Sequence, residues 1–151
     1  MIDYTLEYNS LIQKASSSIG KDILPDKYEI IDLGVPHKPK GLPIGRMGIY
    51  TFSFNDRFLK IGKAGENSGP RFLSQHYNLS SNSTLAASLI RDDELCEFNI
   101  SKMNVKAWIK ANCRRIDIVM DSSVGVFALG FIEALLHYAY EPKYEGFISQ
   151  R

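Results

Sequence analysis

The sequence contains little cysteine, and its cysteines lack the spacing of a zinc or redox motif. Cys96 and Cys113 are the two in 151 residues, and neither belongs to a CxxC pair. The three histidines are not arranged as zinc ligands either. We therefore predict ordinary reduced thiols, in the core or at the surface.

An excess of charge and a long hydrophobic run are also missing. The formal net charge is +1, so attraction to nucleic acid must come from local groups of basic residues. The most apolar stretch, 124–139, is interrupted by Glu133 and His137 and is short for a membrane span. The opening MIDYTLEYNS carries acids and no apolar run, which predicts no signal peptide. We expect a cytoplasmic protein without a membrane partner.

The residues that are present are typical of a globular protein. Apolar residues make up 44% of the chain and aromatic residues 11%, enough for a substantial core. The length predicts a single domain over 1–151. No internal repeat or low-complexity tract interrupts it.

Hydrophobic periodicity and turn residues predict an α+β fold. The proline- and glycine-rich stretch 35–45 predicts a non-helical connector. Ser122 or Ser123 is expected to cap the last helix, and Pro142 to follow its end. The predicted helices cover 5–18, 70–77, 84–90, 104–112 and a final stretch through 139, and the predicted strands cover 27–33, 115–120 and a hairpin over 48–62.

The hairpin sequence GIYTFSFNDRFLKIG carries a tyrosine near one end and a lysine near the other. With a three-residue loop, 55–57, Tyr50 pairs with Gly62 and becomes a diagonal neighbour of Lys60 on one face, about 7–8 Å away at the α-carbons. With a two-residue loop, Tyr50 shares its face with Leu59 instead. A core tyrosine and a surface lysine are the simpler interpretation.

Arg71 follows Pro70, which suits the first turn of a helix. The positive end of the helix dipole disfavours a cation there, unless an anion shares the site. The alternative is an exposed arginine paired with Glu66 or Asp92.

Glu133 is the only acid in the apolar stretch VGVFALGFIEALLHYAY. Burial of an unpaired carboxylate is costly, so Glu133 requires a partner. A metal ion is one candidate. A salt bridge to His137, one helical turn later, is another, and the helix can also turn both side chains to water.

Taken together, these residues resemble the motifs of the GIY-YIG nuclease family. The first motif is intact as Gly48-Ile49-Tyr50. The second reads Lys60-Ile61-Gly62, with lysine in place of tyrosine, as in some restriction-enzyme members. The family's helix arginine, its following polar residue and its metal-binding glutamate correspond to Arg71, His76 and Glu133.

The resemblance covers about 46–144, including the helix end EALLHYAYEP. The asparagine that commonly follows the terminal proline is absent, and Tyr144 and Glu145 occupy that stretch. Residues 1–45 then form an N-terminal extension and connector, and about 78–112 form a helical insertion.

The resemblance implies a small central antiparallel sheet flanked by helices and divalent-metal-dependent cleavage of DNA. Glu133 would hold one Mg²⁺ or Mn²⁺ ion per site, and Arg71 would stabilise charge on the phosphate. Tyr50 would position or deprotonate the attacking water, with Lys60 supplying positive charge or itself holding the water, and His76 would support them by hydrogen bonding. A restriction, defence or mobile-element endonuclease is the leading hypothesis. A degenerate binding module and an RNA or single-strand nuclease toxin are the alternatives.

Two groups of basic residues are candidate nucleic-acid contacts. Helical spacing predicts a stripe of basic residues that could contact nucleic acid. The alternative is a helix face that only water contacts. Further cations lie in and just after the connector and directly after the second motif. The sequence leaves open whether a homodimer reads two half-sites. The stripe comprises Lys102, Lys106, Lys110, Arg114 and Arg115, and the other candidates are His37, Lys38, Lys40, Arg46 and Lys63.

Overall fold

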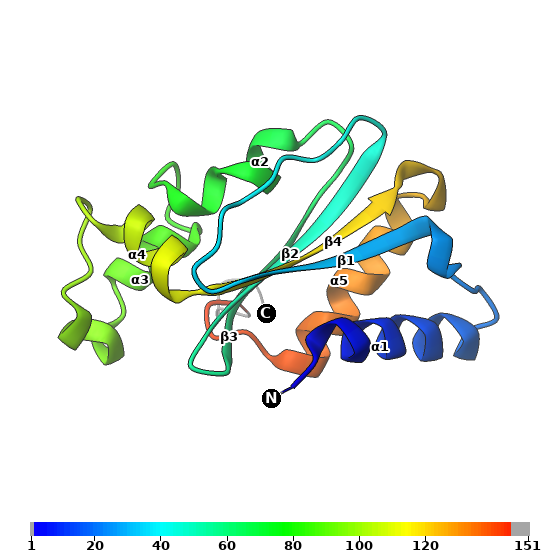
Figure 1. The fold of residues 1–151 in the computed structure, drawn as a ribbon, viewed down its shortest axis with the longest axis horizontal. Helices are drawn as coiled ribbons and strands as arrows, with labels where there is room; N and C mark the ends of the chain where they lie inside the picture. Colours follow the sequence, from blue (N-terminus) through cyan, green and yellow to red (C-terminus); the bar gives the residue numbers. More distant parts are fainter. Residues whose placement is uncertain (1, 146–151) are drawn as a thin grey trace.

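Four antiparallel strands form one sheet in the spatial order β1-β4-β2-β3, seen near the centre of Figure 1. The computed structural model describes residues 2–145. The predicted α+β class and the small antiparallel sheet flanked by helices are confirmed. The strands are β1 (Tyr28–Gly34), β2 (Arg46–Phe54), β3 (Arg57–Ala64) and β4 (Arg114–Asp121).

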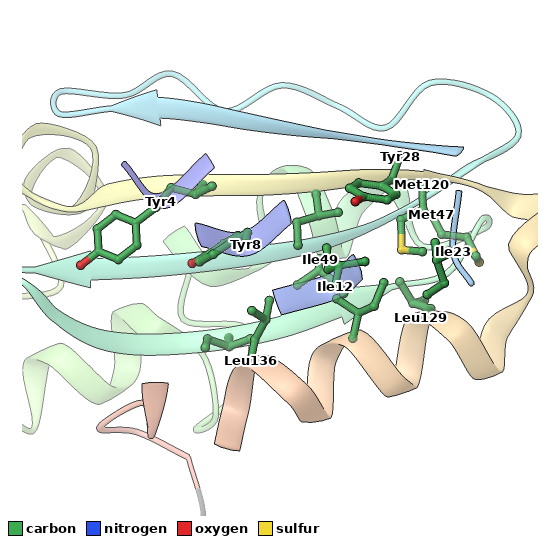
Figure 2. Packing of buried hydrophobic residues seen from close by; sticks show 14 of the residues in the cluster. Tyr4, Tyr8, Ile12, Ile23, Tyr28, Met47, Ile49, Met120, Leu129 and Leu136 are labelled. Atoms are coloured by element: carbon green, nitrogen blue, oxygen red, sulfur yellow. The ribbon is translucent and has the colours of Figure 1, made fainter. Parts of the chain in front are cut away.

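Two long helices cover one face of the sheet. Helix α1 (Tyr4–Ser18) begins at Asp3, whose carboxylate accepts two backbone N–H bonds, and α5 (Val126–Tyr140) packs along β3. Figure 2 shows the core between them, where Ile12 from α1 approaches Ile49 of β2. The predicted N-terminal extension therefore contributes a strand and a helix to the main core.

Three short helices lie on the opposite face, where a second core forms around Tyr50 and Phe52 of β2. They are α2 (Gly69–Leu73), α3 (Leu85–Ile90) and α4 (Val105–Asn112). Four 3₁₀ segments connect the elements, over Pro25–Lys27, Gln75–Tyr77, Asp93–Phe98 and Ser122–Val124. The predicted insertion thus supplies α3 and α4 to this second layer.

Most predicted elements agree with the structure within one or two residues, and two predictions are wrong. The helix expected over 70–77 ends at Leu73 and continues as a separate 3₁₀ turn. The last helix is not capped by a serine: Gly125 precedes it with φ 87°, and Ser122 donates its hydroxyl proton to the carbonyl of Gly45 instead. Met1 and 146–151, the ends of the predicted domain, lie outside the described residues.

The hairpin has the two-residue loop of one predicted alternative and the strand register of the other. The loop is the two-residue one, Asn55 and Asp56, both with positive φ as a type I′ turn requires. A β-bulge then restores the register that a three-residue loop would have produced, because Leu59 is the extra residue on β3. Phe52 faces Lys60 and Tyr50 faces Gly62, as in the alternative with the three-residue loop, although Arg57, a loop residue in that alternative, belongs to β3.

Within residues 2–145, no helix has both the length and the apolar character needed to cross a membrane.

Candidate active site

The glycine of the second motif makes room for Tyr50. Tyr50 on β2 lies opposite Gly62 on β3, and its ring extends across that position. A β-carbon on Gly62 would lie 2.3 Å from the Tyr50 hydroxyl oxygen, closer than side chains approach. Glycine here therefore sets the position of the tyrosine hydroxyl.

The glycine of the first motif lets α2 approach the sheet. A β-carbon on Gly48 would lie 2.3 Å from the ring of Phe72 on α2. The Phe72 ring packs edge-on to Tyr50, with centroids 6.2 Å apart. Arg71 precedes Phe72 on this short helix, so the contact brings the arginine beside the tyrosine.

His76 donates a hydrogen bond to Tyr50, and the direction follows from the second ring nitrogen. The backbone N–H of Leu85 donates to His76 Nδ1 at 3.2 Å, so Nδ1 carries no proton. The proton of the neutral ring is then on Nε2, 2.6 Å from the Tyr50 hydroxyl oxygen. Tyr50 accepts this bond, which leaves its own hydroxyl proton to be given elsewhere.

The surroundings keep His76 uncharged. The pKa of His76 is lowered to about 3, first by burial and then by the positive charges of Lys60 and Arg71. A second proton on the ring would also break the bond from Leu85. His76 is therefore a fixed neutral donor at physiological pH.

The Tyr50 hydroxyl is buried between groups of opposite charge. Burial raises the pKa of Tyr50 above its ordinary value, and the guanidinium of Arg71 opposes this. The carboxylates of Glu133 and Glu145 also raise the Tyr50 pKa. Arg71 is therefore a positive group that acts on Tyr50, a role that the sequence analysis suggested for Lys60.

Lys60 is bound to a carboxylate that the sequence analysis did not assign to the site. Its ammonium lies 2.9 Å from the carboxylate of Glu145, and both side chains are largely buried. Glu145 is in the stretch where the resemblance would place an asparagine. Lys60 and Glu145 are far apart along the chain and no motif connects them, so sequence spacing could not reveal this contact.

Glu133 approaches the site from α5, on the other side of edge strand β3. It pairs with Lys63 of β3, so its predicted salt bridge to His137 does not form. The Nε2 of His137 instead bonds to the carbonyl of Ile61 at 2.9 Å. Arg71 likewise forms no salt bridge with Glu66 or Asp92, its two predicted alternative partners, and Asp92 pairs with Lys143 instead.

A fully buried arginine supports the wall behind Tyr50. Arg115 on β4 donates to Asp117 at 2.7 Å, to the Tyr77 hydroxyl at 3.0 Å and to the carbonyl of Phe72 at 2.7 Å. Four aromatic rings surround its guanidinium, including that of Tyr50 at 5.9 Å. Arg115 thereby ties α2 to the sheet, and it is not a nucleic-acid contact.

The other residues of the predicted basic stripe do not lie on one helix either. Lys106 and Lys110 are on α4, whereas Lys102 lies in the turn before it. Arg114 points to the α1 face, where it pairs with Asp32 and stacks on Tyr4. Alternation along β4 places neighbouring residues on opposite faces, so Arg114 and Arg115 cannot extend a helical stripe.

The basic residues in and next to the connector differ in burial and in their partners. His37 is buried and bonds to the Cys113 carbonyl and the Tyr77 hydroxyl, each at 2.7 Å, so it holds the connector in place. Arg46 lies 3.9 Å from Asp121, while Lys38 and Lys40 are exposed. Lys38 and Lys40 remain candidates for a nucleic-acid contact.

A metal ion at this site would take most of its ligands from substrate and water. Among the described residues, no group of three or more His, Cys, Asp or Glu could enclose an ion. Glu133 offers a hard carboxylate that is 18% exposed and paired with Lys63. Mg²⁺ is commonly held by one or two carboxylates together with substrate phosphate, so Glu133 suits this ion.

Comparison with models of known protein families, with curated proteins and with solved structures gives no match for the chain. The resemblance of its two motifs to those of GIY-YIG nucleases therefore stays a prediction.

Proposed function

We propose that the protein is a divalent-metal-dependent endonuclease that hydrolyses DNA phosphodiester bonds, of the restriction, defence or mobile-element kind. The observation that carries this proposal is the convergence on one buried hydroxyl. Tyr50 receives a hydrogen bond from neutral His76 and is approached by Arg71, and the charge of Glu133 raises the Tyr50 pKa. A general base, a phosphate-binding cation and a metal-binding carboxylate are the groups that such a reaction requires.

Each side chain has a role that its surroundings support. Tyr50 orients the attacking water and takes its proton, with His76 and Arg71 stabilising negative charge on the phenol oxygen. Arg71 is exposed, so it can also contact the phosphate and stabilise the charge that grows there. Glu133 would hold Mg²⁺ or Mn²⁺, which when bound supplies Lewis-acid stabilisation of the phosphate and the leaving oxygen.

The test is cleavage of supercoiled plasmid with Mg²⁺ or Mn²⁺, compared with Glu133→Gln and Arg71→Ala. We expect nicked or linear product from the wild type, none from Glu133→Gln, and a rate about 10²–10³ lower for Arg71→Ala. Glu97→Gln is the matched control, because Glu97 is an exposed carboxylate on a different segment. Filter binding without metal should show that Glu133→Gln still binds DNA. Wild-type cleavage that is unchanged in Glu133→Gln would contradict the metal assignment.

The internal ion pairs favour a second candidate, a module that binds nucleic acid or protein without cutting. Lys60 and Lys63 are each paired with a carboxylate, which reduces the positive charge that they present to a bound phosphate. A panel of duplex DNA, single-stranded DNA and RNA separates the possibilities. Cutting of RNA or single strands alone would indicate the toxin-type nuclease, and binding without cutting in every case would indicate the module.

A further inference from the structure

We propose that Glu145 is a positioning residue that holds Lys60 as a fixed cation beside Tyr50 and His76, so that Lys60 acts as a positive charge and not as the base. This inference rests on the proposed nuclease function. It assigns a role to a residue outside the motifs, and it distinguishes between the two candidates for the base.

The first step is the geometry of the pair. The Lys60 ammonium lies 2.9 Å from Glu145, with side chains 9% and 19% exposed. Two charges this far from water remain together, because separating them would leave each uncompensated. An amine in an ion pair is protonated and has no lone pair with which to accept a proton from water.

The second step is how firmly Glu145 is held. The bulge at Leu59 leaves two successive carbonyls of β3, those of Phe58 and Leu59, accepting the N–H groups of Lys143 and Tyr144 at 3.0 Å. The Lys143 side chain pairs with Asp92 and Glu94, and the Tyr144 hydroxyl donates to Asp92. The turn that carries Glu145 is thus anchored by its backbone and by two preceding side chains.

The third step is what Lys60 does from this position. Lys60 and Tyr50 share a face of the hairpin as diagonal neighbours, since Phe52 faces Lys60 and Tyr50 faces Gly62. The charge of Lys60 also acts on His76, which bonds to Tyr50. A cation here favours a negative phosphate and a negative phenol oxygen, both of which form when Tyr50 is the base.

The closing experiment is a double-mutant cycle in the plasmid assay, with Lys60→Gln, Glu145→Gln and the two combined. We expect about a 10²-fold loss of kcat for Lys60→Gln and about tenfold for Glu145→Gln. The combined variant should be no slower than Lys60→Gln alone, because Glu145 acts only through Lys60. Lys60→Arg should keep activity within about tenfold of wild type, since arginine supplies a cation but cannot act as a base. Glu141→Gln, on the same segment and exposed, is the control.

The outcomes separate this inference from the proposed function. Wild-type cleavage with additive losses, or with Lys60→Arg as slow as Lys60→Gln, would overturn the inference alone. No cleavage of any substrate by the wild type would overturn both.

Thermal unfolding of the same variants checks the pair directly: Glu145→Gln should lower Tm by several degrees, and the combined variant should recover part of that loss. Equal and additive Tm losses would show that the two side chains do not form a pair.

Discussion

The Tyr50 hydroxyl has two donors beside it and a proton of its own to release. Its oxygen accepts from His76 and lies beside Arg71, yet burial keeps its pKa raised. The phenol is therefore protonated at neutral pH, and only a small fraction is ionised. At the residue scale, the proposed base would therefore become active as pH rises.

The first prediction follows from that raised pKa. The ionised fraction of a phenol grows tenfold per pH unit below its pKa, so the logarithm of the cleavage rate should rise by about one per pH unit between pH 6 and 9. Initial rates of plasmid nicking at fixed metal concentration measure this slope. Tyr50→Phe should remove the activity while leaving Tm within a few degrees. A pH-independent rate in the wild type would contradict Tyr50 as the base.

The second prediction concerns the pair of Lys63 and Glu133. Lys63 competes with a metal ion for the same carboxylate, and its side chain is 45% exposed, so the pair is weak. Lys63→Met should tighten Mn²⁺ binding by up to about fivefold in an electron-paramagnetic-resonance titration. Glu133→Gln should abolish that binding. Unchanged Mn²⁺ affinity in Lys63→Met would show that the lysine does not compete for this carboxylate.

At the scale of elements, the edge strand β3 organises the site. Its bulge sets the register that puts Tyr50 beside Gly62, and it also presents the carbonyls that hold the segment carrying Glu145. Its alternation places Lys60 and Lys63 toward opposite layers, where they meet carboxylates from two different parts of the chain. A change in this register would therefore disturb all of these contacts together.

The third prediction tests the close approach at Gly62. Gly62→Ala places a methyl group 2.3 Å from the Tyr50 oxygen, and the buried ring has little space in which to move. We expect a loss of about 1–3 kcal/mol in unfolding free energy, measured by urea denaturation, and nearly complete loss of cleavage. Gly130→Ala is the contrasting control: its position on α5 is open, and alanine should stabilise the helix by up to about 1 kcal/mol. A Gly62→Ala protein as stable and active as wild type would contradict this geometry.

At the scale of the whole molecule, the buried polar groups make stability depend on pH. His76 has a folded-state pKa of about 3, well below the ordinary histidine value of 6.5. Below pH 6.5 the unfolded chain binds a proton that the folded protein excludes, so His76 favours unfolding increasingly as pH falls toward 3. His37, whose pKa is also lowered by burial, acts in the same direction.

The fourth prediction is that the unfolding free energy decreases as the pH is lowered from 6.5 to about 3. His76 contributes about 1.4 kcal/mol per pH unit to this decrease. Urea denaturation across this range measures the slope. His76→Gln should lower stability at pH 7, because the bonds to Tyr50 and Leu85 change, but its pH dependence should be shallower. An identical slope in the variant would show that another group causes the acid sensitivity.

The sequence by itself determined the α+β class and most of the element bounds, and it left the pairing of Tyr50 with Gly62 as one of two alternatives, which the bulge at Leu59 decided. The class and the bounds depend on local periodicity, turn residues and strand alternation, which the printed residues carry. Only the tertiary structure decided the partners of the charged side chains: Lys60 with Glu145, Lys63 with Glu133, and Arg115 within the core. Those partners are far apart along the chain, and a charge at the end of a flexible side chain takes whichever opposite charge folding brings near it.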